Sequence, residues 1–264
     1  MHSLPGIKNS VVLYTGAGGL IGSAACIELA KQGAKLALLD PNIESLKKIS
    51  DAIRNIDPEL PHSIHGNTNT LNSDSIDQCL AEIESKLGPI DCLISSAYPR
   101  TADWHLKFEK IPMESWQKNV DDHLNSYFLM GQRCAVKMML RGKGNIIFFS
   151  SIYGLSGPRF DVYDGLSDMT MPAGYAAIKG GISNLTKYMA SYLGPSGIRV
   201  NAICPGGVQD SQNVSFIKSY CKQVPLRRMA NLDDICGPLL FLVSDYSNYM
   251  SGVNLPVDGG WLAT

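Results

Sequence analysis

The sequence predicts an α/β protein built around a mostly parallel sheet with helices on both faces. Three observations predict this class. Short β-type runs alternate with amphipathic stretches along the whole chain. The β-type runs are continuously apolar, which is typical of strands buried on both sides. The length of 264 residues, with 45% hydrophobic residues, is enough for one sizeable core, so we expect a single domain over residues 1–264.

The expected elements follow one another in a regular order. We expect strands at 11–14, 36–39, 92–95, 146–149 and 198–203. We expect helices at 20–31, 43–56, 75–87, 113–140, 175–193 and 233–243. The segment 155–173 is rich in Gly, Pro and Asp, which predicts a long loop, and loops of this length are usually functional or disordered.

Charge and composition exclude several functional classes. The chain has 23 Lys and Arg against 24 Asp and Glu and no local basic excess, which argues against nucleic acid or an anionic membrane as a partner. No apolar run reaches the roughly 20 residues that span a bilayer, and no secretory signal precedes the first strand, so we expect a cytoplasmic protein. The seven scattered cysteines include no CxxC pair, which excludes the usual disulfide frameworks and thiolate zinc sites, and we expect no metal.

A glycine-rich turn joins the first strand to the first helix, with the sequence TGAGGLIG at 15–22. Glycines let the backbone approach a pyrophosphate, and the free N–H groups and dipole of the helix N-terminus stabilise its charge. An ordinary strand-to-helix turn is the alternative interpretation. Because the turn lies at the first βα junction of an alternating chain, we favour dinucleotide binding.

Asp40 follows the second strand, 18 residues after Gly22. A carboxylate there can accept hydrogen bonds from the adenosine ribose hydroxyls and repels a 2′-phosphate. No Arg or Lys lies between Gly16 and Gly22 to attract that phosphate. The sequence therefore favours NAD over NADP as the cofactor, and the alternative is that Asp40 is only a turn residue before Pro41.

Tyr175 and Lys179 lie one helical turn apart on the same face of an expected helix. Ser151 follows the strand at 146–149, at the carboxyl edge where α/β proteins place their ligands. A positive Lys179 and an oxidised nicotinamide would each lower the pKa of Tyr175 and make it a usable general base. The Ser151 hydroxyl could hold the reacting oxygen.

Six motifs in order resemble the short-chain dehydrogenase/reductase family over nearly the whole chain. They are TGAGGLIG at 15–22, Asp40, SSIYG at 150–154, YAAIK at 175–179, NAICPGG at 201–207 and SGVNLPVDGG at 251–260. The resemblance implies a Rossmann-type, doubly wound, seven-stranded parallel sheet in the order 3-2-1-4-5-6-7, with its last strand near 253–256. It also implies hydride transfer between a nicotinamide and a carbinol or carbonyl carbon.

The resemblance further implies a role for individual residues. Tyr175 would be the acid/base, Ser151 would orient and polarise the substrate oxygen, and Lys179 would bind the nicotinamide ribose and tune Tyr175. The residues implied to contact the cofactor are Gly16, Gly18, Gly19, Leu20, Ile21, Gly22, Asp40, Asn69, Ser96, Ala97, Tyr175, Lys179, Pro205, Gly206 and Val208. Asn69 takes the place of the acidic residue that usually follows the third strand, with Asn67 as the alternative match.

The sequence also departs from the family pattern. Leu20 stands where Gly or Ala is usual, and Tyr98 replaces a small residue after SSA at 95–97. The catalytic Asn, seven residues after Trp116, is replaced by His123. His123 is either a structural histidine or orders the water that passes protons from Lys179, in which case activity gains a further pH dependence.

Arg100 and Arg159 are candidate substrate ligands. If both lie over the carboxyl edge of the sheet, their paired N–H donors could bind a phosphate or carboxylate. The alternative is that they are solvated or paired with nearby Asp residues. The motifs SSAYPR, GPRF and TMPAGYAAIK also resemble a branch found in bacterial surface-sugar and flagellin-glycan pathways that make sialic-acid-like sugars.

The sequence therefore predicts an NAD-dependent oxidoreductase acting on a polar, sugar-like alcohol or ketone that we expect to be anionic. A reductase of 3-oxoacyl or other lipid-like ketones is one alternative. A catalytically inactive dinucleotide-binding sensor or assembly protein is the other. We expect a small-molecule substrate. The resemblance also implies a homo-oligomer, a tetramer or dimer, formed through the helices at 113–140 and 175–193.

Overall fold

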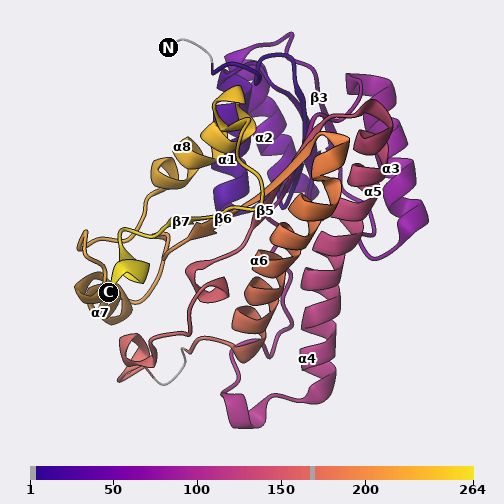
Figure 1. Cartoon of the computed structure of the whole chain (residues 1–264). Helices are drawn as coiled ribbons and strands as arrows, with labels where there is room; N and C mark the ends of the chain where they lie inside the picture. The colour runs from indigo at the N-terminus through magenta and orange to yellow at the C-terminus, as the bar shows by residue number, and fades with distance from the viewer. Residues whose placement is uncertain (1–3, 167–169) are drawn as a thin grey trace.

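The computed structural model describes residues 4–166 and 170–264, and its strands form one parallel sheet. Figure 1 shows this sheet between two groups of helices. The strand order is β3-β2-β1-β4-β5-β6-β7, which confirms the predicted topology. The strands are β1 (Val11–Thr15), β2 (Lys35–Leu39), β3 (His62–His65), β4 (Cys92–Ser95), β5 (Gly144–Phe149), β6 (Ile198–Pro205) and β7 (Asn254–Val257).

Helices cover both faces because the strands are apolar on both sides. In β1, Val11 and Leu13 face one core and Val12 and Tyr14 face the other. One face is covered by α1 (Leu20–Lys31), α2 (Ile43–Ile56) and α8 (Leu232–Val243). The opposite face is covered by α3 (Ser73–Leu87), α5 (Ser126–Arg141) and α6 (Ala173–Leu193). The predicted helices at 20–31 and 43–56 are confirmed to the residue.

Five segments differ from the sequence-based expectation. The predicted helix at 113–140 is divided by a π-helical turn (Val120–Asn125) between α4 (Met113–Asn119) and α5. The sequence pattern gives no residue range for strand β3 or for helix α7 (Val214–Gln223), and β7 begins one residue later than expected. The predicted loop 155–173 contains a short 3₁₀ turn (Phe160–Tyr163), and its residues 167–169 lie outside the described residues.

Within the described ranges, every helix is too short or too polar to span a bilayer. The chain crosses from β3 on one side of β1 to β4 on the other. This change of direction opens the carboxyl edge of the sheet between β1 and β4, which is where open α/β sheets bind their ligands. The turns that follow β1, β2, β4, β5 and β6 therefore meet at one edge.

Candidate active site

The glycine turn after β1 approaches the segment after β4 very closely. Gly16 has a φ of +76°, and a Cβ atom there would lie 2.7 Å from the Ala97 Cα. Ser96 donates both its backbone N–H and its hydroxyl to the Thr15 carbonyl, each at 3.1 Å. Helix α1 then begins at Leu20, and no side chain caps its first turn. Its free first-turn N–H groups suit a pyrophosphate.

Asp40 lies beside this turn and accepts two backbone hydrogen bonds. Gly18 N–H donates to Oδ2 at 3.0 Å, and Asn42 N–H donates to Oδ1 at 2.9 Å. These bonds are those of a turn residue, and they also place the carboxylate against the glycine turn, where a ribose would lie. The side-chain oxygen of Asn69 is used within its own turn, where it accepts from Leu71 N–H at 3.0 Å.

The end of β5 is held tightly against helix α6. Ser150 Oγ donates to the Lys179 carbonyl at 2.9 Å and bonds Ser183 Oγ at 2.7 Å. A Cβ atom at Gly154 would lie 2.5 Å from Ser150 Oγ and 2.6 Å from the Lys179 carbonyl oxygen, so only glycine permits this approach. Ser151 is buried at the start of the 3₁₀ turn Ile152–Gly154. Ser151 is thereby brought close to helix α6, which carries Tyr175 and Lys179.

Tyr175 and Lys179 project together from α6. The Lys179 Nζ lies 5.6 Å from the Tyr175 ring centroid and donates to the Phe149 carbonyl at 2.7 Å. Burial of the Lys179 side chain lowers its pKa to about 7. Burial also raises the pKa of Tyr175, and a hydrogen bond with Ser151 acts against that rise. The three side chains therefore share one partly desolvated site.

His123 completes this group from the π-helical turn. It is fully buried, and its Nε2 lies 3.3 Å from Lys179 Nζ. Burial, followed by the charge of Lys179, holds the pKa of His123 well below its ordinary value. Because an ammonium group can only donate, the neutral imidazole accepts at Nε2 and is assigned its hydrogen at Nδ1. Nδ1 has no hydrogen-bond partner among the described residues, so a donor is directed into a buried space.

Tyr98, in the segment after β4, lies against this group. Its ring centroid is 5.5 Å from that of Tyr175 and 5.5 Å from that of His123. Its hydroxyl accepts a hydrogen bond from Trp104 Nε1 at 2.7 Å. Sequence reasoning noted Tyr98 only as a departure and missed Trp104, because nothing in the spacing of Trp104 connects it to the site.

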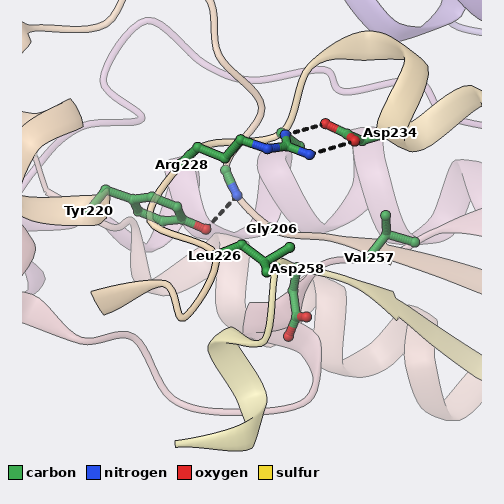
Figure 2. Close-up of a pocket in the computed structure, with 10 residues that line it drawn as sticks. Gly206, Tyr220, Leu226, Arg228, Asp234, Val257 and Asp258 are labelled. Atoms are coloured by element: carbon green, nitrogen blue, oxygen red, sulfur yellow. Dashed lines mark hydrogen bonds and ion pairs between the residues drawn. The ribbon is translucent and has the colours of Figure 1, made fainter. Parts of the chain in front are cut away.

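The segment after β6 is fixed from three sides. Gly206 N–H donates to the Val257 carbonyl at 2.9 Å, and Gly207 N–H donates to the Tyr220 hydroxyl at 2.5 Å. Val208 pairs with Ala230 in a parallel bridge. Figure 2 shows the cavity of about 140 Å³ beside this segment, with Tyr220 of α7 on one side.

An ion pair also lines this cavity. Arg228 Nη1 and Nη2 lie 2.5 Å and 2.9 Å from the two carboxylate oxygens of Asp234 (Figure 2). The residues predicted to flank a nicotinamide, Pro205, Gly206 and Val208, therefore have a rigid support. Sequence reasoning missed Tyr220 because it missed helix α7.

The structure does not bring Arg100 and Arg159 into a common set of contacts. The Arg100 guanidinium lies 5.3 Å from the Tyr98 ring centroid, beside the site. The Arg159 guanidinium lies 4.9 Å from the Trp261 ring and donates to Gln223 Oε1 at 2.9 Å and to the Trp261 carbonyl at 3.3 Å. Arg159 therefore holds the C-terminal segment against α7, and Arg100 lies beside the Tyr98 ring.

Within residues 4–166 and 170–264, no three His, Cys, Asp or Glu side chains are grouped so that they could hold a metal ion. The seven cysteines are free thiols, and all but Cys221 are buried.

Comparisons with known proteins agree with this geometry. A family model described as enoyl-(acyl carrier protein) reductase matches residues 16–262. The chain is similar to post-translational flagellin modification protein A of Campylobacter coli, with 30% identity over 97% of this chain and 99% of that protein. It is similar to a probable galactose dehydrogenase of Rhizobium meliloti, with 33% identity over 97% of this chain and 96% of that protein. Among solved structures, a short chain dehydrogenase from Leptospira borgpetersenii with bound NAD+ has a TM-score of 0.83 and 33% identity, covering 96% of this chain and 93% of that one.

Proposed function

Because the chain belongs to the short-chain dehydrogenase/reductase family, we propose that it is an NAD-dependent oxidoreductase acting on a CH–OH or C=O group of a polar, sugar-like substrate. One observation carries the proposal. Ser151, Tyr175, Lys179 and His123 meet at the carboxyl edge of the sheet, beside a glycine turn that fits a dinucleotide.

The cofactor residues suit NAD. The first-turn N–H groups of α1 would hold the pyrophosphate. Asp40 would accept hydrogen bonds from the ribose hydroxyls and repel a 2′-phosphate. Ser96, Ala97 and the segment 205–208 lie at the same edge and would flank the rest of the molecule. A bound nicotinamide supplies the hydride acceptor or donor of the reaction.

The side chains of this protein would transfer the proton of the substrate hydroxyl. In alcohol oxidation, Tyr175 would take the hydroxyl proton while Ser151 donates a hydrogen bond to the same oxygen. In its protonated form, which a pKa of about 7 populates at and below neutral pH, Lys179 would favour the phenolate form of Tyr175. His123, which accepts from Lys179 and has a free N–H at Nδ1, would extend the path for that proton toward water.

The substrate class is supported by the named relatives and by the polar surroundings of the site. A galactose dehydrogenase and a flagellin modification protein are consistent with a sugar. The anionic character of the substrate is supported only by Arg100, which is exposed beside Tyr98. Arg100→Met should therefore raise KM for carboxylated or phosphorylated sugars, leave kcat nearly unchanged and leave neutral sugars unaffected. Equal effects on charged and neutral sugars would contradict an anion contact.

A homo-oligomer is the proposed assembly. Helix α6 exposes Tyr188 and Tyr192, whose rings stack at 6.1 Å, and the neighbouring α5 exposes Phe128, Met139 and Leu140. Single surface hydrophobic residues are ordinary, but several large ones exposed on two neighbouring helices suit a second copy of the chain.

The test is turnover with a matched variant. Purified protein should reduce NAD+ with at least one member of a panel of neutral sugars, sugar acids and sugar phosphates, or oxidise NADH with the corresponding ketones. Tyr175→Phe should bind NAD+ as the wild type does and lose about 10²–10⁴-fold in kcat, because only the proton-transfer group is removed. Tyr249→Phe, at an exposed tyrosine outside the site, is the control.

Other outcomes identify the alternatives. Turnover of acetoacetyl-CoA but of no sugar would favour a 3-oxoacyl reductase. Binding of NAD+ without turnover of any carbonyl or alcohol would favour a sensor or assembly protein. Full activity of Tyr175→Phe would reject the assigned proton transfer.

A further inference from the structure

Tyr98 is partly exposed, and its neighbours fix the position of its side chain. The side chain leaves 42% of its surface accessible, yet its ring contacts both Tyr175 and His123. Its hydroxyl is held by Trp104, which is only 5% exposed and therefore rigidly placed. A large, anchored and partly open aromatic side chain next to a reacting group is typical of a binding surface, because its contacts cost little conformational entropy.

The chemistry of this surface is defined by three groups. Because the Tyr98 oxygen accepts from Trp104, its own hydrogen remains available to a substrate acceptor. The aromatic ring has a negative face that attracts positively polarised C–H groups. The Arg100 guanidinium, 5.3 Å from the ring centroid, adds further donors at the same place.

The position of the surface relative to Tyr175 decides what it contacts. The two rings meet edge to face, at an interplanar angle of 73°. For an alcohol whose reacting oxygen lies at the Tyr175 hydroxyl, Tyr98 and the Arg100 guanidinium that lies over its ring are among the nearest groups beyond the reacting carbon, because the two tyrosine ring centroids are 5.5 Å apart. A cyclic polyol has ring C–H groups and several hydroxyl acceptors beyond the reacting carbon, whereas a short linear diol offers only one further hydroxyl.

We propose that Tyr98 is a specificity-determining residue, which contacts the substrate beyond the reacting carbon and selects cyclic polyols over short linear ones. The inference rests on the proposed function and deepens it. Trp104 is a positioning residue for Tyr98. The large side chain that departs from the family pattern thus becomes the feature that selects the substrate.

The test compares cyclic and linear probes in matched variants. The cyclic probes are D-galactose and L-rhamnose, and the linear probe is meso-2,3-butanediol, each with NAD+. Tyr98→Ala should lower kcat/KM for the cyclic probes by about 10- to 100-fold and for the diol by less than about threefold. Tyr98→Phe, which removes only the hydroxyl, should lower the cyclic values by about 3- to 10-fold. Tyr246→Ala, at an exposed tyrosine outside the site, should change neither.

A binding measurement separates this inference from the proposed function. Tryptophan fluorescence of the complex with NADH should change when a cyclic probe is added, and Tyr98→Ala should abolish the change. Sugar binding that depends on Tyr98 without hydride transfer would support the inference and reject the proposed reaction. Turnover of the diol alone would support an oxidoreductase and overturn the inference. Equal losses for cyclic and linear probes, or no binding of either sugar by the wild type, would also overturn it.

Discussion

Lys179 should make the stability of the protein unusually dependent on pH. Its ammonium group is buried, and within the described residues its hydrogen-bond partners are the Phe149 carbonyl and the His123 imidazole, with no carboxylate among them. Burial lowers the pKa of Lys179 from 10.5 to about 7. Between these two values the unfolded chain binds a proton that the folded chain does not. The free energy of unfolding should therefore be reduced below about pH 7 and should rise as the pH increases from 7 toward 10.5.

The size of this effect follows from the two pKa values. Each pH unit between them corresponds to about 1.4 kcal/mol, so Lys179 alone should contribute a rise of about 4 kcal/mol between pH 6 and pH 10. Lys179→Met removes the titration and keeps the length of the side chain. The difference in unfolding free energy between wild type and Lys179→Met should change by this amount over the same range, with the variant relatively more stable at the acidic end.

Urea unfolding of the protein without cofactor measures this difference directly. Curves recorded by tryptophan fluorescence at pH 6, 7, 8, 9 and 10 give the free energy for each variant. Lys187→Met, at an exposed lysine on the same helix, controls for the loss of a positive charge. Groups that do not contact Lys179 titrate alike in all three proteins and cancel in the comparison. If the wild type and Lys179→Met differ by the same amount at every pH, the lysine is not desolvated as the structure indicates and the reasoning is wrong.

Three further predictions concern the cofactor, the proton path and the assembly. Asp40→Ala should weaken NAD binding about 10- to 100-fold and NADP binding much less, and equal losses in titrations of both cofactors would identify Asp40 as a turn residue only. His123→Asn keeps an acceptor for Lys179 and should remain active. His123→Leu removes that acceptor, so it should reduce turnover and lower the pKa of Lys179, and an alkaline limb of ketone reduction set by loss of the Lys179 proton should move to a lower pH by about one unit. An unchanged pH–rate profile in the Leu variant would favour a structural histidine. Tyr192→Glu should shift the mass in light scattering toward the monomer, and a wild type that is already monomeric would contradict the proposed interface.

The elements that could be predicted from the sequence are those whose burial leaves an unmistakable pattern. The strands at the centre of the sheet are continuous apolar runs, and the helices beside them have one apolar face. Strand β3 has the sequence HSIH and lies at the edge of the sheet with three of its four residues only partly buried, so no apolar run reveals it. Helix α7 packs against a small satellite cluster around Trp261 and not against the main sheet, so its pattern is weak.

Some features of the candidate site could likewise be predicted from the sequence, and others could not. Ser151, Tyr175 and Lys179 could be placed because each follows a predictable element at a fixed spacing. The contact between His123 and Lys179 depends on the π-helical turn, which periodicity does not reveal. The contacts of Arg159 could not be predicted because its partners, Gln223 and Trp261, lie about 60 and 100 residues further along the chain, beyond the reach of any local pattern.

The π-helical turn has a consequence for the way this protein can change by mutation. A π turn is one residue longer than an α-helical turn, so it amounts to an insertion within a helix. Deletion of a single codon within residues 120–125 would restore a regular helix and rotate α4 by about 100° relative to α5. Both helices would remain helical, but the imidazole would leave Lys179 and Asn119 would lose its hydrogen bonds to Thr101. The number of residues in this turn is therefore a requirement of the site, and a one-residue deletion here should be less tolerated than most substitutions.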